Sequence, residues 1–411
     1  MINLTRLEER IQSLGKIGST PDGGVTRVAL SEEDKEAQTL VSSWMEQAGM
    51  SIHLDPAGNL IGRYEGTSKT AQPIVIGSHI DSVVNGGKFD GVIGVLGGIE
   101  VIQHLKEEGI QTLRPIEVVA FCEEEGSRFQ SGLFGSRAMI GASIEQDLDL
   151  KDKQGITRRE ALIEFGLDPD KIKEQAVRSR GELTAYLEMH IEQGPILEKM
   201  GAPVGIVTDI AGPAWMEVVV DGKAGHAGTL PMSMRRDALL GASEIALYVE
   251  KTCLSYPGTP VVGTVGHFEV LPGGSNIVPG RVVFSVDVRD VDEARRNDVI
   301  NQIKIGAQKV CDRRELHVSF NERLRVNPVQ CSSSIVNVMK DKSQEMELVC
   351  PELISGAGHD AQLMATIAEM GMIFVRCKDG VSHNPEEFAE TADIALGIEL
   401  LSRVTLHFAM Q

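Results

Sequence analysis

Two short polar segments combine histidine with closely spaced carboxylates, the side chains that bind divalent metals. They are residues 77–82, GSHIDS, and residues 123–126, EEEG. Asp90 lies between them, and two later histidines, His190 and His383, lie in similarly polar turns. Imidazole and carboxylate together can hold a divalent cation that activates water without thiolate ligands. The sequence therefore predicts a metal-dependent hydrolase.

The elements around these segments predict a parallel α/β core. Residues 73–77 and 116–121 are short apolar runs typical of buried strands, and residues 91–107 between them carry apolar side chains at helical spacing. A strand, a helix and a strand in this order favour parallel pairing. Ligands of open parallel sheets bind at the carboxyl ends of the strands. Both polar segments follow a predicted strand and so stand where a site is expected.

The sequence changes character after residue 211. The predicted elements of the following region are strands mixed with helices, at residues 215–222, 235–251, 261–270, 281–290 and 299–311. Such a mixture is typical of a small α+β domain. Residues 371–376 then form another short apolar run, typical of a buried strand like those predicted before residue 211. We expect an α/β fold in which a discontinuous catalytic domain, residues 1–211 and 328–411, has a mainly parallel sheet flanked by helices. The inserted residues 212–327 are expected to form a smaller α+β lid or dimerisation domain.

Composition and charge exclude several classes of partner. The chain has 411 residues and a formal net charge of −19, which argues against binding the phosphates of nucleic acid. The N-terminal pattern is amphipathic and lacks the apolar segment of a signal peptide, and no run of residues suits a membrane span. The six cysteines form no C-x-x-C pair, which predicts free thiols in a reducing compartment. We therefore expect a cytoplasmic protein that acts on a small molecule rather than on nucleic acid or a membrane.

Several of the candidate residues also have an ordinary structural explanation. His79 and Asp81 are two residues apart and point to the same side of an extended chain, so Asp81 could hold the second ring nitrogen of a metal-binding histidine. Alternatively, they are a histidine and a solvated acid at a strand end. Asp90 either ligates a metal, with room to bridge two, or caps the helix that follows it.

The glutamates and the later histidines leave similar alternatives. Three adjacent carboxylates at the end of a buried strand repel one another unless a cation compensates them, although an acidic turn in solvent is the alternative. With a metal present, one glutamate could ligate while its neighbour transfers a proton. His190 and His383 are, taken singly, structural polar residues as readily as ligands.

Together and in this order, the motifs resemble a known group, the two-metal aminoacylase and carboxypeptidase superfamily. They resemble most closely its branch of N-carbamoyl-L-amino-acid hydrolases, allantoate amidohydrolases and β-ureidopropionases. The resemblance runs over essentially the whole chain. The segments that carry it are residues 77–82, 86–91, 123–129, 188–194, 225–231, 273–279, 355–360 and 380–385.

The resemblance implies two divalent metal ions per subunit, and the donor types accept Zn, Mn, Co or Ni. The ligands would form two sets, His79, Asp90 and His190 for one ion and Asp90, Glu125 and His383 for the other. Asp90 would then bridge the ions. Glu124 would be the general base of the hydrolysis.

The resemblance also implies substrate-binding residues, mostly in the insert. His226 would reach the active site of a partner subunit in a homodimer formed by the lid and would stabilise the oxyanion, although a loop hydrogen bond is the alternative. Asn276 and Arg289 would hold a substrate carboxylate, and Arg289 could otherwise be an exposed residue at a strand end. The remaining pocket candidates that resemble family positions are Gln193 and His359.

The activity implied is hydrolysis of the ureido group of an N-carbamoyl-L-amino acid to the amino acid, ammonia and carbon dioxide. Allantoate amidohydrolases tend to carry an arginine at the start of the insert, where this chain has Trp215 beside Ala214 and Met216. An indole favours an apolar substrate side chain over a second ureido arm, unless Trp215 belongs to the core of the lid. The alternatives are allantoate hydrolysis, another aminoacylase-like or dipeptidase activity on the same metals, or a metal-stabilised binding protein without catalysis.

Overall fold

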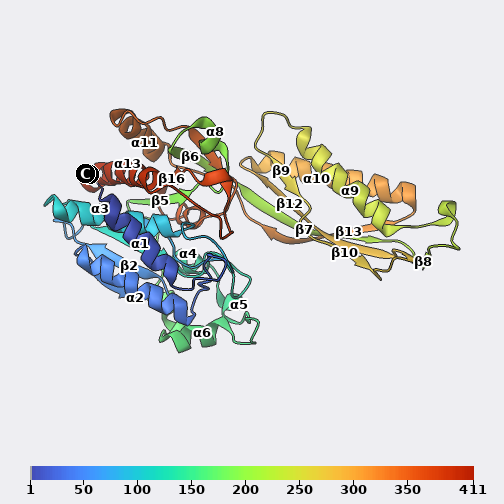
Figure 1. Cartoon of the computed structure of the whole chain (residues 1–411), viewed down its shortest axis with the longest axis horizontal. Coiled ribbons are helices and arrows are strands. Elements are labelled where there is room, and N and C mark those ends of the chain that lie inside the picture. Colours follow the sequence, from blue (N-terminus) through green and yellow to red (C-terminus); the bar gives the residue numbers. More distant parts are fainter. Residues whose placement is uncertain (1) are drawn as a thin grey trace. The chain divides into compact units, whose positions relative to one another are not determined.

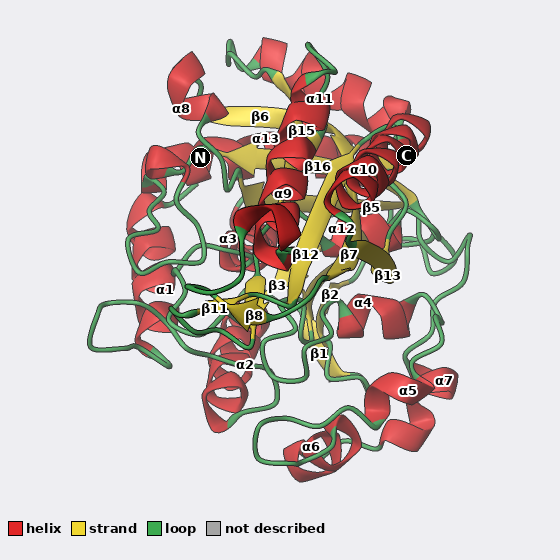
Figure 2. Ribbon diagram, turned by 90° about the vertical axis from the view of Figure 1, so that its right-hand side faces the viewer, coloured by secondary structure: helices red, strands yellow, loops and turns green. Residues whose placement is uncertain are grey.

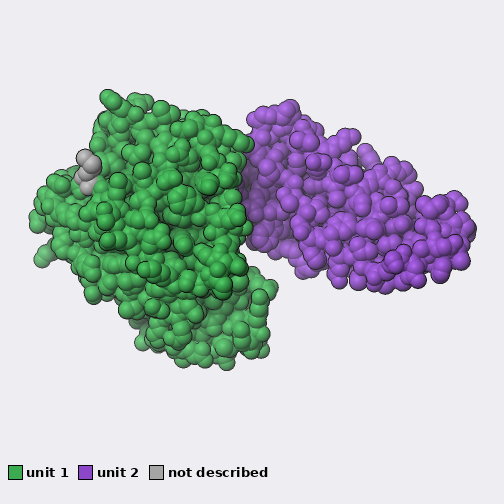
Figure 3. Space-filling model, in the orientation of Figure 1, with its two compact units in different colours: residues 1–208, 331–353, 359–411 green, residues 209–330, 354–358 purple. Residues whose placement is uncertain are grey.

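The computed structural model describes residues 2–411 and divides the chain into two compact units (Figure 3). Unit 1 contains the chain up to Thr208 together with Cys331–Leu353 and His359–Gln411, and unit 2 contains Asp209–Gln330 and Ile354–Gly358. The chain therefore leaves unit 1 and returns to it. The lid or dimerisation role expected for residues 212–327 stays a prediction.

A sheet whose strands lie mainly in unit 1 has the order β1-β2-β4-β3-β5-β16-β6-β14, and β15 pairs with β6 (Figure 2). The strands are β1 Ser51–Leu54, β2 Leu60–Tyr64, β3 Ile74–His79, β4 Ile116–Phe121, β5 Ala185–Ile191, β6 Val204–Ile210, β14 Val329–Gln330, β15 Glu352–Ser355 and β16 Glu369–Val375. The central strands β4, β3, β5 and β16 are parallel, whereas β1, β2, β6 and β14 pair antiparallel. The predicted α/β class is confirmed, with antiparallel strands at both ends of the parallel centre.

Strand alternation assigns the polar residues to one face of this sheet. Every residue of β3, β4 and β5 is buried, as expected for parallel strands covered on both faces. His79 and His190 share a face because Ile76 of β3 is aligned with Leu187 of β5. Gly77 lies on that face too, where a Cβ atom would stand 2.8 Å from the Phe121 ring. The missing side chain leaves room for the aromatic residues beneath the histidines.

Helices cover both faces of the unit 1 sheet (Figure 1). They are α1 Leu4–Lys16, α2 Glu32–Gln47, α3 Val92–Glu107, α4 Phe134–Met139, α5 Glu145–Leu148, α6 Arg158–Phe165, α7 Ile172–Gln175, α8 Ile196–Met200, α11 Ser333–Glu345, α12 Asp360–Met364 and α13 Thr391–Ala409. Two short 3-10 turns are η1 Pro169–Lys171 and η3 Lys378–Gly380. Helix α3 packs closely on the sheet because Gly94 faces the Met189 carbonyl, which a Cβ atom would approach to 2.4 Å. This close packing brings the start of α3, and with it Asp90, to the strand ends.

Unit 2 is an antiparallel sheet with two long helices on one face. Its strands are β7 Gly212–Asp221, β9 Val262–Thr264, β10 Phe268–Leu271, β12 Arg281–Asp290 and β13 His317–Arg325, in the order β10-β12-β7-β13 with β9 also on β12. The helices are α9 Ala238–Leu254 and α10 Glu293–Arg314. A separate two-stranded sheet pairs β8 Gly225–His226 antiparallel with β11 Ile277–Val278, and the short 3-10 turn η2 Met232–Met234 follows β8. The inward residues of β12, Val282, Phe284, Val286 and Val288, form a core with α9 and α10.

One predicted strand of unit 2 is two strands in the structure. Residues 261–270 divide into β9 and β10, which pair with different parts of β12. The break falls at His267, whose backbone carbonyl accepts a hydrogen bond from Ser285 N–H and whose N–H donates to Ser285 Oγ. A side-chain oxygen thus replaces one rung of the ladder, which a pattern of apolar residues does not reveal.

The remaining observations concern thiols and membranes. All six cysteines are free, and four of them are buried, as the spacing predicted. Among the described residues, no helix combines the length and apolarity that crossing a membrane requires.

Candidate metal centre

Four adjacent strands of the unit 1 sheet deliver the polar residues at their carboxyl ends. His79 ends β3, and His190 lies near the end of β5. Residues 123–125 follow β4 after Cys122, and His383 follows β16 after η3. Because these strands are adjacent and parallel, their carboxyl ends meet at one edge. The side chains come together there from segments up to about 300 residues apart in the sequence.

Asp90 stands between two sets of donors and offers one carboxylate oxygen to each. Its Oδ1 lies 3.0 Å from His190 Nε2 and 3.8 Å from His79 Nε2. Its Oδ2 lies 3.3 Å from His383 Nε2, which lies 3.5 Å from Glu125 Oε2. Within each set the donor atoms lie within 4.8 Å of one another. Two histidines with one carboxylate, and one histidine with two carboxylates, are donor sets that fit a first-row divalent metal.

The electrostatics of the cluster also fit cations. Burial raises the pKa of Glu124 well above its usual range, although His79 opposes the rise. Burial and the neighbouring Asp90 raise the pKa of Glu125 to about 7. A hydrogen bond to Asp90 is the main reason why the pKa of His383 is raised to about 9. Burial therefore disfavours the charged forms of Glu124 and Glu125, whereas the histidines hold the pKa of Asp90 well below its usual range. Bound metal ions would favour the charged carboxylates.

The histidine rings are oriented by backbone carbonyl groups. His79 Nδ1 lies 3.1 Å from the Asp81 carbonyl oxygen, and His190 Nδ1 lies 3.0 Å from the Ile191 carbonyl oxygen. A carbonyl can only accept, so both rings carry a proton on Nδ1 and turn Nε2 toward Asp90. Nε2 is therefore the nitrogen that would bind a metal once it is unprotonated.

The Asp81 carboxylate, which the sequence placed beside the His79 ring, mainly binds backbone N–H groups of the glutamate turn. Its Oδ1 lies 3.5 Å from His79 Nδ1, farther than the Asp81 carbonyl. The two carboxylate oxygens accept hydrogen bonds from the backbone N–H groups of Glu124, at 3.3 Å, and Glu125, at 3.2 Å. Asp81 thereby connects the end of β3 to the glutamate turn after β4.

Glu387 is a supporting residue that sequence reasoning missed. Its carboxylate accepts hydrogen bonds from the backbone N–H groups of Phe89 and Asp90 and from Ser382 Oγ. The Ser382 hydroxyl also lies 2.6 Å from Asp90 Oδ2. A Cβ atom at Gly87 would lie 1.9 Å from the Glu387 carboxylate, so this loop needs glycine. Glu387 is 297 residues from Asp90, and no local pattern marks it.

A further acid lies beneath the histidines. Glu188, His190 and His359 offer donor atoms within 4.8 Å of one another. Both oxygens of Glu188 already accept hydrogen bonds, from Ser78 Oγ, Tyr186 OH and the Ala361 N–H group. Burial and His190 hold the pKa of His359 well below its usual value. Glu188 is therefore occupied in holding α12 to the sheet, and His359 packs on His190 with ring centroids 4.6 Å apart.

Two more predicted residues lie beside the donor sets. Glu124 Oε2 lies 3.7 Å from His79 Nε2, and the Glu124 side chain is 13% exposed. Gln193 Nε2 donates a hydrogen bond of 2.8 Å to Asp90 Oδ2. The structure thus gathers His79, Asp81, Asp90, Glu124, Glu125, His190, Gln193, His359 and His383 within unit 1.

The other four candidates lie in unit 2, in two groups. His226 is exposed on β8 beside Asn276, because the Ala227 N–H donates to the Asn276 carbonyl oxygen. Trp215 and Arg289 lie on the face of the sheet opposite the helices. Arg289 Nε and Nη2 donate to Asp287 Oδ2 at 3.0 and 2.8 Å, and Nη1 donates to the Gly356 carbonyl oxygen. Trp215 is aligned with Asp287 across β7 and β12.

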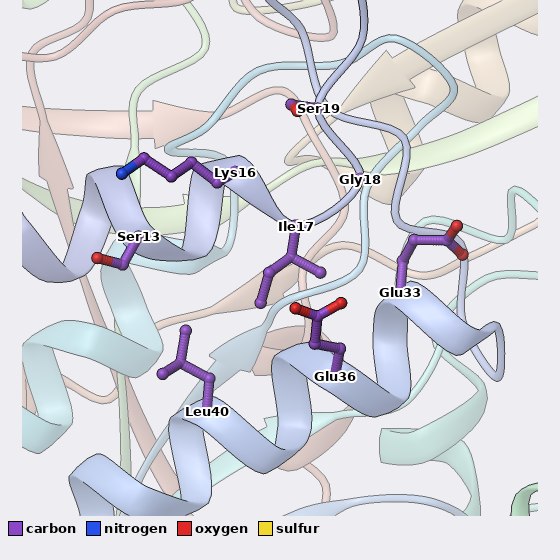
Figure 4. A pocket seen from close by; sticks show the side chains of 8 residues that line it. All are labelled: Ser13, Lys16, Ile17, Gly18, Ser19, Glu33, Glu36 and Leu40. Carbon is purple, nitrogen blue, oxygen red and sulfur yellow. The ribbon is translucent and has the colours of Figure 1, made fainter.

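A groove of about 580 Å³ lies on unit 1 beside α1 and α2 (Figure 4). Charged side chains of both signs line it, Lys16 from α1 and Glu33 and Glu36 from α2. None of the predicted site residues lines this groove. The donor sets at the strand ends therefore remain the candidate site.

The fold and the donor sets define an α/β protein with a histidine–carboxylate metal site, and comparisons with known proteins identify its family. The chain belongs to Peptidase family M20/M25/M40, whose model matches residues 75–407. It is 50% identical to an N-carbamoyl-L-amino-acid amidohydrolase of Pseudomonas sp. (strain NS671), over 97% of this chain and 97% of that relative. It is 44% identical to an N-carbamoyl-L-amino acid amidohydrolase of Geobacillus stearothermophilus, over 98% of this chain and 97% of that relative. A crystal structure of an amidase of the hydantoinase/carbamoylase family from Burkholderia multivorans matches with a TM-score of 0.93 at 38% identity, covering all of this chain and 98% of that one. The resemblance inferred from the motifs is confirmed.

Proposed function

We propose that this protein hydrolyses the carbamoyl group of N-carbamoyl-L-amino acids to the amino acid, ammonia and carbon dioxide. The chain is a hydrolase of linear amide and ureido C–N bonds, similar over its whole length to amidohydrolases of that name. The single observation that carries the proposal is Asp90, which offers one oxygen to each of two donor sets with Glu124 beside them. Such a site suits hydrolysis of an unactivated amide.

Two divalent ions per chain are the proposed cofactors. Three protein donors would hold each ion, and Zn, Mn, Co and Ni all accept these donor types. When bound, divalent ions supply Lewis acidity toward the carbonyl oxygen and lower the pKa of water. Gln193 and Ser382, which both lie within hydrogen-bonding distance of Asp90 Oδ2, hold the shared carboxylate in place.

Glu124 is the proposed general base. It takes a proton from the attacking water as the water oxygen bonds to the ureido carbon. The Glu124 carboxyl then gives this proton to the leaving nitrogen as the carbon–nitrogen bond breaks. The carbamate that remains decomposes to ammonia and carbon dioxide. Burial, which raises the pKa of Glu124, makes its carboxylate a stronger base than a solvated one.

Unit 2 supplies the proposed substrate contacts. Asp287 accepts from Nε and Nη2 of Arg289, and the Gly356 carbonyl accepts from Nη1, which leaves one N–H group on each of Nη1 and Nη2 for a substrate carboxylate. Asn276 is the second proposed carboxylate contact. Trp215, 43% exposed on the same face as Arg289, favours an apolar substrate side chain.

The protein is proposed to act as a homodimer formed through unit 2, so that His226 of one subunit stabilises the oxyanion in the other. Three leucines on the outer face of α9, Leu240, Leu247 and Leu254, are exposed and seven residues apart. A stripe at this spacing can pack against a second helix. The free cysteines support a reducing, cytoplasmic location.

The test is Glu124→Gln, assayed by ammonia release from N-carbamoyl-L-methionine and, in parallel, from allantoate. We expect bound metal to stay at the wild-type level while turnover falls by about 10² to 10⁴-fold. The matched control is Glu164→Gln, on the exposed side of α6. A Glu124→Gln enzyme with most of its activity would refute the assigned base. If the wild-type enzyme released ammonia faster from allantoate than from N-carbamoyl-L-methionine, the proposed substrate would be refuted.

A further inference from the structure

The first glutamate of the turn after β4 is turned away from solvent into a separate buried cluster. Glu123 is fully buried. Its backbone φ is 54°, in the left-handed region that residues other than glycine rarely adopt. Its Oε1 accepts a hydrogen bond from Phe129 N–H, and its Oε2 accepts one from Arg158 Nε, both at 3.0 Å. Glu123 is thus held on both carboxylate oxygens, immediately before the proposed base and metal ligand.

Arg158 is equally enclosed. It is the first residue of α6 and has no exposed surface. Its guanidinium lies over two aromatic rings, 4.9 Å from the Phe129 centroid and 4.3 Å from the Phe134 centroid. It also donates to the Ser131 carbonyl oxygen, at 2.9 Å, and lies 3.3 Å from Asp147 Oδ1. The residues that surround the ion pair belong to a small apolar core formed by α4–α7 and the turn itself.

The backbone of the turn is fixed from two sides. The N–H groups of residues 133–135, where α4 begins, donate in order to the carbonyl oxygens of Glu124, Glu123 and Cys122. On the other side, the Asp81 carboxylate accepts from the N–H groups of Glu124 and Glu125. The Glu123 side chain adds a third attachment, to a helix that starts 35 residues later.

Stability alone does not explain a buried ion pair at this position. Removing two charges from water is costly, and apolar side chains of similar volume are often as stabilising or more so. An apolar residue at 123 would fill the core but could not bind Phe129 N–H and Arg158 together. It would therefore leave the left-handed backbone conformation without the contacts that hold it.

We propose that the Glu123–Arg158 ion pair is a positioning clamp, which fixes the direction of the Glu124 and Glu125 side chains through the backbone of the turn. The inference rests on the proposed roles of Glu124 and Glu125. Glu123 itself touches neither substrate nor metal in this account. The segment between β4 and β5, which contains α4–α7, then serves to hold the turn rigid. A small misplacement of a catalytic group is sufficient to reduce turnover strongly.

The first test replaces the ion pair by apolar side chains of similar length, in the double variant Glu123→Leu with Arg158→Met. We expect a folded protein with a lower melting temperature, since the core stays filled but the Phe129 N–H and the Ser131 carbonyl lose their partners. We expect kcat to fall by about tenfold or more with KM within about twofold, because the base is displaced while substrate contacts are kept. A double variant that is folded and keeps the wild-type kcat would overturn the proposal.

The second test uses Glu123→Gln, which keeps the size and an oxygen acceptor and leaves Asp147 beside the Arg158 charge. The cobalt-substituted protein gives a readout independent of turnover, because its visible spectrum reports the arrangement of ligands around the metal. We expect a changed spectrum and weaker cobalt binding in equilibrium dialysis, together with a several-fold lower kcat. Unchanged values of all three would overturn the proposal even if the double variant failed to fold.

The matched control is Glu117→Gln on the same strand, β4. Glu117 is 3% exposed and lies 2.6 Å from Arg63, far along the strand from the glutamate turn. We expect it to lower the melting temperature without changing kcat or the cobalt spectrum. A failure of the proposed function appears differently, as a Glu124→Gln enzyme that remains active. In that case the cobalt spectra of the Glu123 variants still decide whether the clamp positions Glu125.

Discussion

The donor groups of unit 1 are crowded, and His79, Asp90 and His190 are buried while His383 is exposed. The candidate substrate groups of unit 2 are exposed or already paired. Asp90 precedes α3 and the histidines around it come from different strand ends. Burial opposes their charged forms, but the histidines together lower the pKa of Asp90 well below its usual range, and Asp90 raises the pKa of His190. Arg289 is paired with its neighbour Asp287, and His226 is exposed on the short strand β8. A buried cluster of like charges is costly and needs a cation, so it points to chemistry by itself. The residues of unit 2 carry no such cost, and only a ligand would reveal their role.

The sharpest way to break this contrast is Asp90→Asn, which keeps the shape but removes the shared charge. Because Asp90 faces both donor sets, we expect loss of bound metal and a fall in turnover on the order of 10³-fold or more. Metal analysis and ammonia release measure the two effects. The control is Asp152→Asn, which alters an equally buried aspartate that pairs with Arg128 instead. Full metal content in Asp90→Asn would contradict the shared-ligand account.

Arg289→Lys addresses the unit 2 side of the comparison. Lysine keeps the charge but loses the planar fork, so we expect KM to rise by about 10- to 100-fold with a smaller change in kcat. Metal content should not change. Arg281→Lys, at the other end of β12 beside Asp221, is the control. If kcat falls while KM stays constant, Arg289 does not bind the ground-state carboxylate.

Leu247→Glu tests whether the leucine stripe of α9 holds two copies together. A charge in the middle of the stripe is expected to raise the dissociation constant of the dimer by at least about 100-fold. Light scattering during size-exclusion chromatography measures the mass at each concentration. Ile163→Glu, an exposed apolar residue of α6 in unit 1, should leave the mass unchanged. If the wild-type protein were monomeric at all concentrations, the proposed homodimer would be refuted.

Asp34→Asn tests the burial cost away from the donor sets. Burial raises the pKa of Asp34 to about 7 in the folded chain, against a usual value near 4 when unfolded. Between these values the folded state holds more protons, so this group's contribution to stability is lost as pH rises from about 4 to 7. Relative to the wild type, the free energy of unfolding of the variant in urea should rise by about 3 kcal/mol between pH 5 and pH 8. If the free energies of unfolding of the two proteins changed with pH in parallel, the raised pKa of Asp34 would be contradicted.

The sequence predicted the parts of this arrangement that depend on local patterns. The apolar runs that became β4 and β12 have the predicted bounds, and the polar motifs lie at the strand ends that parallel pairing requires. The contacts of Glu387 with Asp90 could not be predicted, because the two residues are 297 positions apart and meet through a turn. The role of the Glu123 side chain could not be predicted either, because its partner Arg158 is 35 residues away, in helix α6. Arg158 resembles any charged residue at the start of a helix until the fold buries it.

A crystal structure of the zinc-loaded Glu124→Gln protein, with anomalous scattering at the zinc edge, tests the central claim most directly. The account predicts two anomalous peaks per chain on either side of Asp90, one beside His79 and His190 and one beside Glu125 and His383. The protein in these crystals should release ammonia from N-carbamoyl-L-methionine at least about 10²-fold more slowly than the wild type. A single peak, or peaks away from Asp90, would contradict the shared metal centre.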